Sequence, residues 1–386
     1  MFEHHSINFE ILKERAFNLR WATVQDGVIP LTAADPDFPC ATEISDSIIE
    51  YAKSGYFNYG PTEGLAAFKQ ALHCFFKEKR DYNLAAEQIL PVDSAAFGIQ
   101  VVCKALLSPG DEAIIFDPVD FLFQFCITQT QGIPIRFPIL PGASTVDFAL
   151  LESLITPKTK LICLCNPLNP TGKVFTREEL LELGRITVKH NLVVLSDEIW
   201  SDIVFTPHKF TSLGSLSPEI SERTITVTGF SKSYGLAGLR TGVIASANKE
   251  IYRKLFETSL HTYTVHGANI LGQVAGIAAL TKAQSWLTSY VSHLEKMRAL
   301  VTERINQMNG LSTIAPEGCF VSFINIKETG HSAESFQKHM LEKANVLVVP
   351  GLSRWFGPGA EGYVRISFAT SEEVLTEALN RIEEAL

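Results

Sequence analysis

The sequence predicts an α/β protein with a large domain, built on a mainly parallel central sheet flanked by helices, and a smaller α+β domain. Three observations lead to this fold class. Short apolar runs alternate with amphipathic helical patterns through the middle of the 386-residue chain. Polar motifs follow several of these runs directly, as ligand-binding residues do at the carboxyl ends of parallel strands. From residue 285 the pattern changes to a long helix, then short strands and two shorter helices.

Apolar runs bounded by turn residues are expected to form the strands of the sheet. Between them lie helical patterns: one ends at Ser-Pro-Gly, and another is preceded by Thr176, which suits an N-cap. The expected strands are Ala113–Phe116, Lys160–Cys165, Leu192–Ser196, Thr224–Thr228 and Thr241–Ala245, and the two helices are Ser94–Leu107 and Arg177–His190.

These patterns divide the chain into three segments. Residues 46–284 are expected to form the large domain, and residues 285–386 the small C-terminal domain. Residues 1–45 are expected to be an N-terminal segment that belongs to the small domain. We find no internal repeat and no low-complexity linker between them.

Composition excludes several classes of function. A formal net charge of −9 and a pI near 5.6 argue against nucleic acid as the main partner. No apolar stretch reaches transmembrane length, and the N-terminus does not resemble a signal peptide, so we expect a cytoplasmic protein with no membrane partner. The seven scattered cysteines form no paired metal motif, and the ten histidines show no HExxH spacing. No metal site is therefore expected.

The segment Gly229–Arg240 is the first candidate for chemistry. Lys232 follows an apolar run, and a lysine is costly to bury unless it has a function. Desolvation would lower the pKa of its amine and make it a nucleophile toward aldehydes. Arg240 could pair with a phosphate that approaches the small residues of the segment. On this segment alone, a surface lysine in a flexible Gly/Ser loop is an equal alternative.

Two further segments place polar side chains directly after expected strands. Asn166–Gly172 contains two prolines that stiffen the turn and leave Asn169 as a positioned amide. For Asn166, an Asx-turn that simply ends the strand is a credible alternative. Asp197 ends an apolar run and must find a cationic or hydrogen-bonding partner, either in the core or on a protonated heterocycle.

A last segment carries an arginine among apolar residues. In Phe356–Phe368, Arg365 alternates with apolar side chains on an expected strand. This position is unfavourable for a guanidinium unless an anion lies opposite it.

Taken in order, these segments resemble the fold type I pyridoxal phosphate enzymes, specifically the class I/II aminotransferases. Leu31–Phe38 resembles the N-terminal segment of that family and Tyr59–Gly64 its intersubunit tyrosine motif. The motifs NPLNPTG, SDEIW, GFSKSYGLAGLR and FGPGAEGYVR follow in the family order. The resemblance covers nearly the full length, and it implies that residues 46–284 bind pyridoxal 5′-phosphate.

The resemblance also implies a role for each matching residue. Lys232 would form a Schiff base with the cofactor and then act as general acid and base at the substrate Cα. Asp197 would keep the pyridinium nitrogen protonated, and Asn169 would hydrogen-bond the ring hydroxyl oxygen beside the substrate. Arg365 would bind the substrate α-carboxylate, helped by the backbone near Ala34. The phosphate would be held by Ser94, Ala95, Ser231 and Arg240, and by Tyr59 of the partner subunit in a homodimer.

Three residues depart from the family pattern. Trp200 stands where many relatives have a tyrosine, and its N–H can only donate. Asp120 stands where relatives place an aromatic ring that stacks on the cofactor; Phe121 or Phe123 could take over the stacking. We expect Trp200 and Asp120 to lie at the cofactor. Asp93 would repel a phosphate unless it faces away as a helix cap.

The leading interpretation is therefore amino-group transfer between an L-amino acid and a 2-oxo acid. One alternative is a C–S β-lyase similar to cystathionine β-lyase, which Ala33–Phe38 and Trp200 favour. Another is a catalytically silent relative that binds the cofactor. The side chain of the amino-acid substrate is not encoded in a recognisable motif, although the Phe-rich segment Phe121–Phe125 indicates an apolar, aromatic or sulfur-containing one.

Overall fold

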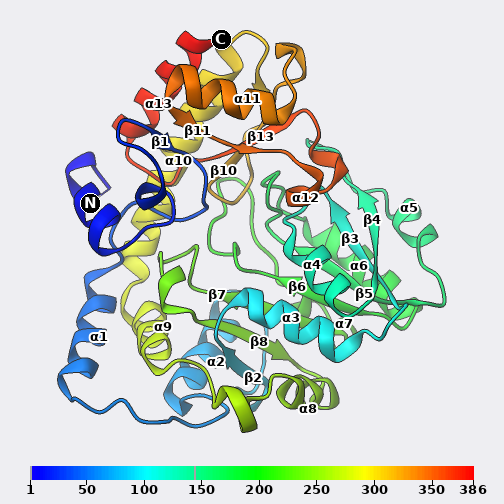
Figure 1. Ribbon diagram of the computed structural model, residues 1–386. Coiled ribbons are helices and arrows are strands. Elements are labelled where there is room, and N and C mark those ends of the chain that lie inside the picture. The colour runs from blue at the N-terminus through cyan, green and yellow to red at the C-terminus, as the bar shows by residue number, and fades with distance from the viewer. Residues whose placement is uncertain (1, 143–144) are drawn as a thin grey trace.

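The computed structural model describes residues 2–142 and 145–386, and a seven-stranded sheet lies at its centre (Figure 1). The strand order is β2-β8-β7-β6-β5-β3-β4. Strand β8 runs antiparallel to both of its neighbours, whereas the other adjacent pairs are parallel. The strands are β2 (Ile89–Val92), β3 (Glu112–Asp117), β4 (Ile133–Pro138), β5 (Thr159–Cys165), β6 (Val193–Asp197), β7 (Thr224–Gly229) and β8 (Gly242–Ser246).

The mainly parallel sheet expected from the sequence is confirmed, and the five expected strands are β3, β5, β6, β7 and β8. Strand β8 is antiparallel because residues 230–241 contain only a short 3-10 turn, Ala237–Leu239, and no crossover helix. This connection instead stays at the carboxyl end of β7, where Lys232 lies. The strands β2 and β4 at the two edges were not anticipated.

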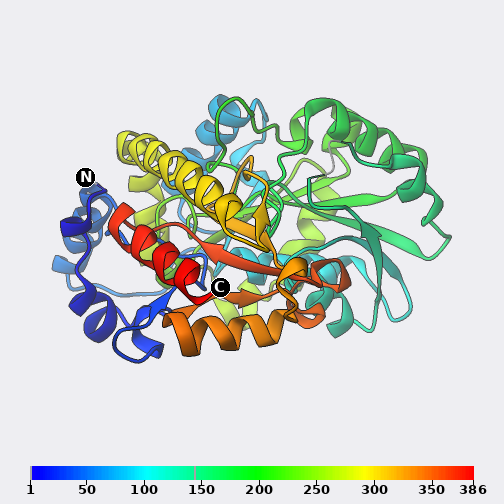
Figure 2. The same cartoon turned by 90° about the horizontal axis from the view of Figure 1, so that it is seen from above.

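Helices cover both faces of this sheet. Helix α3 (Ala95–Leu106) packs on β6, β7 and β8, with α4 (Leu122–Gln129) and α8 (Lys249–Thr258) beside it. Figure 2 shows α2 (Ala66–Arg80) and α6 (Arg177–Lys189) on the opposite face. The remaining helices of this part are α1 (Thr42–Lys53), α5 (Phe148–Ser153), α7 (Pro218–Ser221) and α9 (Ile270–Lys282).

Side-chain caps explain where the two expected helices begin. The hydroxyl of Thr176 accepts a hydrogen bond from the N–H of Glu179, whose carboxylate accepts from the N–H of Thr176, and this capping box starts α6. The hydroxyl of Ser94 accepts from the N–H of Phe97 at 3.0 Å and starts α3. Both expected helices are confirmed to within about one residue at each end.

A second, four-stranded antiparallel sheet follows in the C-terminal part of the chain (Figure 1). It begins after the long helix α10 (Gln284–Gln307), which the sequence pattern from residue 285 predicted. Its strand order is β12-β13-β10-β9, with β9 (Ser312–Thr313), β10 (Val321–Asn325), β12 (Val349–Pro350) and β13 (Tyr363–Ser367), and its helices are α11 (Ala333–His339), α12 (Ser353–Phe356) and α13 (Glu372–Ala385).

The N-terminal segment pairs with the C-terminal part. Strand β1 (Ile29–Pro30) lies parallel to β11 (Val346–Leu347), and the N–H of Leu31 donates to the carbonyl of Leu347 at 2.9 Å. The residues after β1 then cross toward the carboxyl ends of β5, β6 and β7. This crossing brings residues 32–37 to the site described next.

None of the helices in residues 2–142 and 145–386 is both long enough and apolar enough to span a bilayer. In the same residues, no cluster of His, Cys, Asp and Glu side chains has the composition of a metal site.

Candidate active site

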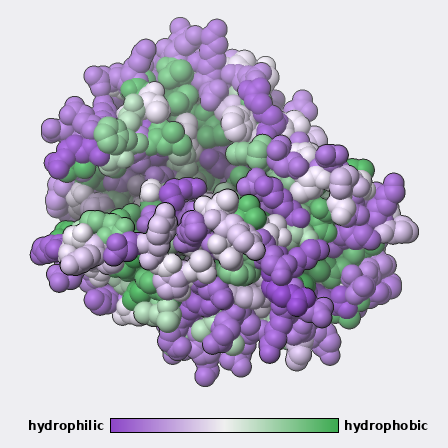
Figure 3. All heavy atoms as spheres, turned by 60° about the horizontal axis from the view of Figure 1, so that its bottom comes forward, coloured by the Kyte–Doolittle hydropathy of each residue, from purple (hydrophilic) through white to green (hydrophobic). Residues whose placement is uncertain are grey.

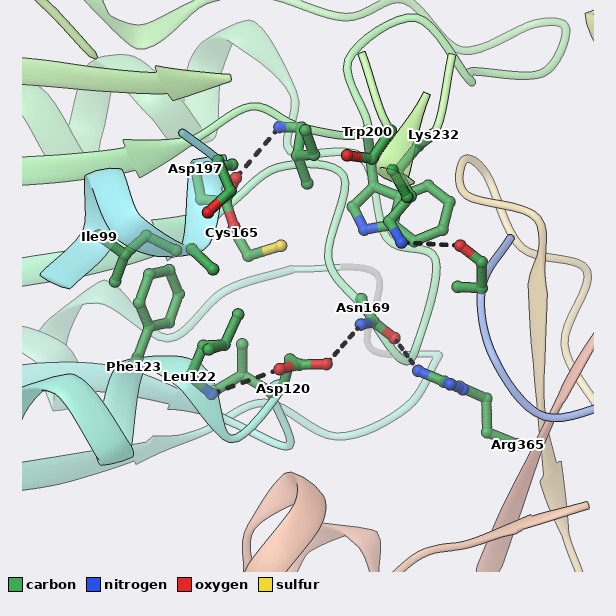
Figure 4. Close-up of a pocket in the computed structure, with 18 of the residues that line it drawn as sticks. Ile99, Asp120, Leu122, Phe123, Cys165, Asn169, Asp197, Trp200, Lys232 and Arg365 are labelled. Atoms are coloured by element: carbon green, nitrogen blue, oxygen red, sulfur yellow. Dashed lines mark hydrogen bonds between the residues drawn. The ribbon is translucent and has the colours of Figure 1, made fainter. Parts of the chain in front are cut away.

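A cavity of about 280 Å³ opens at the carboxyl ends of β5, β6 and β7. Its wall combines residues from the large sheet, the N-terminal segment and β13, which are far apart in the sequence (Figure 4). All the candidate residues from the sequence except Tyr59 line it: Ala34, Ser94, Ala95, Asp120, Asn169, Asp197, Trp200, Ser231, Lys232, Arg240 and Arg365.

Lys232 extends from the connection after β7 into this cavity. Its Nζ donates a hydrogen bond to the carbonyl oxygen of Ala34 at 2.7 Å and lies 5.3 Å from the centroid of the Trp200 ring. Burial lowers the pKa of the Lys232 amine, and the cation of Arg365 acts in the same direction. The carboxylates of Asp35, Asp120 and Asp197 oppose this shift. The amine is therefore more readily neutral, and so more nucleophilic, than that of an exposed lysine.

Asp197 is the last residue of β6 and lies on the wall of the cavity. Its Oδ1 accepts a hydrogen bond from the N–H of Ile199 at 3.1 Å. Burial raises the pKa of the Asp197 carboxyl to about 7, and the neighbouring charges of Asp120 and Glu198 add to this effect. A cationic group in the cavity would stabilise the ionised carboxylate at this position.

A chain of hydrogen bonds joins Asp120, Asn169 and Arg365 across the cavity (Figure 4). The Nδ2 of Asn169 donates to Oδ2 of Asp120 at 3.1 Å, and its Oδ1 accepts from Nη1 of Arg365 at 3.1 Å. The other terminal nitrogen of Arg365 donates to the carbonyl of Thr32 at 3.0 Å. Its Nε is buried and has no partner among the described residues.

Arg365 is buried, and Asn169 gives its guanidinium an uncharged partner. Burial lowers the pKa of Arg365, whereas the charge of Asp120 raises it. A buried guanidinium with an unpartnered nitrogen is a site for a carboxylate, which can accept two parallel hydrogen bonds from it.

The opposite end of the cavity can hold an anion. Helix α3 begins there with Ala95 after the Ser94 cap, and the first N–H groups of a helix lack intrahelical partners. Ser231 and Arg240 line the same cavity. A Cβ on Gly242 would lie 2.3 Å from the carbonyl carbon of Ser94, so glycine is required for β8 to pass this close to the start of α3.

The structure accounts for two departures from the family pattern. Asp93 is not a helix cap, because Ser94 caps α3; its Oδ1 instead accepts from the N–H of Asn269 at 3.3 Å, at the start of α9. Trp200 is buried and packs edge-on against Phe320, with ring centroids 4.7 Å apart. Its ring contributes an apolar surface beside Lys232.

The two aromatic residues after Asp120 lie in different places. Phe123, on α4, lines the cavity together with Ile99 of α3. Phe121 packs against Trp355, with ring centroids 5.3 Å apart, and lies outside this cavity.

Tyr59 is 88% exposed and packs beside His266 on the surface of its own chain. Asn166 has a structural role, but not as the Asx-turn considered from the sequence, because its Oδ1 accepts from the N–H of Phe175, nine residues on, at 3.1 Å.

Sequence reasoning missed Asp35 and Cys165. Asp35 follows Ala34, and its charge acts on the amine of Lys232. Cys165 is the last residue of β5 and lines the cavity. The position of Cys165 just before Asn166 could have indicated it, whereas the approach of Asp35 to Lys232 depends on a long-range fold.

A second cavity of about 330 Å³ adjoins the first. Asp120 and Arg365 line both cavities. The wall of the second is otherwise mainly apolar and includes Leu19, Ala33, Phe121, Val349, Trp355 and Phe356, together with Thr23 and Thr32.

Comparisons with known proteins agree with this arrangement. Residues 26–382 match the family model described as aminotransferase class I and II. An aspartate aminotransferase of Pyrococcus horikoshii is 32% identical and covers 95% of this chain and 92% of its own. An aromatic-amino-acid aminotransferase of Thermococcus litoralis is 33% identical, with 94% and 92% covered. The crystal structure of a PLP-bound putative aminotransferase from Clostridium difficile is 27% identical, with a TM-score of 0.89 and 97% and 96% covered.

Proposed function

Since the chain belongs to the class I and II aminotransferase family, we propose that the cavity lined by Lys232 is the active site and that the amino-acid substrates carry apolar side chains. The chain is an aminotransferase, and its cofactor is pyridoxal 5′-phosphate. The resemblance inferred from the sequence is thereby confirmed, while the roles of single residues and the substrate class are our proposal.

The residues of the cavity fit the cofactor at both of its ends. Asp197 is a buried carboxylate that forms no ion pair among the described residues and suits a protonated ring nitrogen. Ser94, Ala95, Ser231 and Arg240 suit a phosphate, because they combine helix N–H groups, a hydroxyl and a guanidinium. Lys232 lies on the wall of the same cavity and would bond the cofactor covalently.

When bound, the cofactor supplies a carbonyl carbon for amine exchange and a ring that withdraws electrons from the substrate Cα. Lys232 has two tasks: its neutral amine makes the covalent bond and, once displaced, takes the proton from Cα and returns one. Asp197 stabilises a positive charge on the ring. Asn169 offers its second amide hydrogen to the ring hydroxyl oxygen while its other groups bind Asp120 and Arg365.

Arg365 is the proposed site for the substrate α-carboxylate. This assignment rests on its buried, unpartnered Nε and on its place between the two cavities. A carboxylate there would compete with the carbonyl of Thr32 for the guanidinium, and the backbone near Ala34 would lie beside it.

The second cavity carries the substrate proposal. An amino acid whose carboxylate binds Arg365 and whose Cα lies near Lys232 can extend its side chain into this cavity. The rings of Phe121, Trp355 and Phe356 form much of its wall. Desolvation of an apolar side chain there contributes about 25 cal/mol per Å² of buried apolar area, which favours aromatic, aliphatic and thioether side chains.

A homodimer is proposed from the surface around Tyr59. Tyr56, Phe57, Tyr59 and Tyr263 are all more than 60% exposed, and such a group of aromatic side chains is characteristic of an interface. Apolar patches within a mostly hydrophilic surface are visible in Figure 3. In a homodimer, Tyr59 would reach the phosphate site of the partner. Sedimentation should give a particle of twice the chain mass, and a monomer would contradict this proposal.

The substrate proposal is tested by incubating the holoenzyme with single amino acids and no oxo acid, while recording the absorption band of the bound cofactor. Phenylalanine, leucine and methionine should convert the band faster than serine or alanine. A preference for these two small donors would contradict the assignment of the second cavity. Release of pyruvate and ammonia from cystathionine without an acceptor would instead indicate the lyase activity.

A further inference from the structure

Asp120 is held rigidly at the junction of the two cavities. Its Oδ1 accepts from the N–H of Leu122 at 3.3 Å and its Oδ2 from Nδ2 of Asn169 at 3.1 Å. Its own N–H donates to the carbonyl of Asn169 at 3.2 Å. These bonds fix the carboxylate where a substrate side chain would pass from the first cavity to the second.

The charge of this carboxylate acts on both cavities. Burial raises the pKa of the Asp120 carboxyl, while the cations of Arg365 and Lys232 oppose that shift. Asn169 lies between Asp120 and Arg365 and hydrogen-bonds both. Asp120 therefore acts electrostatically on the Arg365 guanidinium, and among the described residues Asn169 bridges the two instead of a direct ion pair.

The second cavity offers nothing to neutralise an anionic side chain. Of the described residues that line it, Arg365 alone is cationic, and the proposed function uses Arg365 for the α-carboxylate. A second carboxylate would lose its hydration against Phe121, Trp355 and Phe356 and would lie beside Asp120.

We propose that Asp120 is a specificity-determining residue that selects amino-acid substrates by the charge of the side chain and rejects dicarboxylic ones. This proposal rests on the proposed function. Like charges in a poorly hydrated site repel strongly, so specificity arises from a penalty on the wrong substrate as well as from contacts with the right one.

The test compares donors of similar length and different charge on the wild-type holoenzyme and on Asp120→Asn. Asparagine keeps the size of the side chain and an acceptor oxygen but removes the charge. The donors are glutamate, glutamine and ornithine, and the readout is kcat/KM for conversion of the bound cofactor. Ratios between donors on one variant cancel any change in cofactor occupancy or folding.

For Asp120→Asn, the glutamate-to-glutamine ratio should rise by on the order of tenfold, and the ornithine-to-glutamine ratio should fall. An equal loss for all three donors would indicate a structural role and would overturn the proposal, as would unchanged ratios. The matched control is Asp26→Asn, which removes the same charge from a surface side chain that is 97% exposed, and should leave both ratios at their wild-type values.

A binding measurement separates this proposal from the proposed function. Glutarate and pentanoate differ mainly by one carboxylate, and their binding can be followed without any turnover by the intrinsic tryptophan fluorescence, because Trp200 lines the first cavity and Trp355 the second. Asp120→Asn should strengthen glutarate binding about tenfold relative to pentanoate even if no donor converts the cofactor. Equal effects on both ligands would overturn the role of Asp120, and failure of every donor would overturn only the proposed function.

Discussion

The amine of Lys232 and the carbonyl of Ala34 form a 2.7 Å hydrogen bond between residues 198 positions apart in the sequence. Ala34 belongs to the segment that crosses from β1, beside the C-terminal part, to the edge of the large sheet. The bond therefore closes the cavity with a segment from outside the large sheet and fixes the direction of the amine. The acidity of Lys232, and with it the covalent chemistry that we propose for its amine, depends on the burial that this wall provides.

Replacement of Lys232 by alanine should abolish covalent attachment of the cofactor. Borohydride reduction followed by mass spectrometry of the intact chain should show the cofactor adduct on the wild type and none on Lys232→Ala, because a methyl group cannot bond a carbonyl carbon. Lys209→Ala, at an exposed position, is the control and should keep the full adduct. An adduct retained on Lys232→Ala would refute the assignment.

The fold and the site were unequally accessible from the sequence. Lys232, Asp197 and Asn169 could be identified because each follows an apolar run, and strand ends of a parallel sheet converge. The antiparallel direction of β8 and the hydrogen bond of Asp93 with Asn269 depend on packing between residues remote in the chain. The local pattern of apolar and polar residues in the sequence does not predict such long-range contacts.

Asp35 should tune the acidity of Lys232. The pKa of Lys232 lies below its ordinary value because of burial, and the charge of Asp35 opposes this shift. Removing that charge with Asp35→Asn should lower the pKa of Lys232 further. The neutral amine would then persist to lower pH, so the pH profile for uptake of the cofactor by the apoenzyme should move toward lower pH. A profile that moves upward would contradict this electrostatic coupling.

Asp197 should destabilise the cofactor-free protein as the pH rises. Burial raises its pKa to about 7, so the folded state holds a proton that the unfolded state releases between about pH 4 and 7. The stability contributed by this proton is present at low pH and is lost as the pH approaches 7. Asp197→Asn removes this loss. Without cofactor, the Tm of the variant minus the Tm of the wild type should therefore increase from pH 4 to pH 7, by on the order of 2 °C.

The cofactor should stabilise the wild type more than it stabilises Asp197→Asn. A cation against Asp197 stabilises the ionised carboxylate, so the cofactor should raise the Tm of the wild type by more than that of Asp197→Asn. Scanning calorimetry of both proteins with and without cofactor measures the two differences. An equal increase in Tm would contradict the pairing of Asp197 with the ring.

Gly242 should control the affinity for the phosphate through backbone shape alone. A Cβ at this position would lie 2.3 Å from the carbonyl carbon of Ser94 and 2.4 Å from the nitrogen of Ala95. Because neither backbone atom can yield like a flexible side chain, Gly242→Ala must displace the start of α3. The N–H groups proposed to bind the phosphate would move with it, so we expect the cofactor Kd to rise about tenfold or more.

Gly238→Ala is the matched control, because a Cβ there meets no atom within 4 Å, and its Kd should equal that of the wild type. Titration of the apoenzymes by absorbance gives both constants. Equal affinity of the two variants would show that the phosphate does not depend on the close approach of β8 to α3.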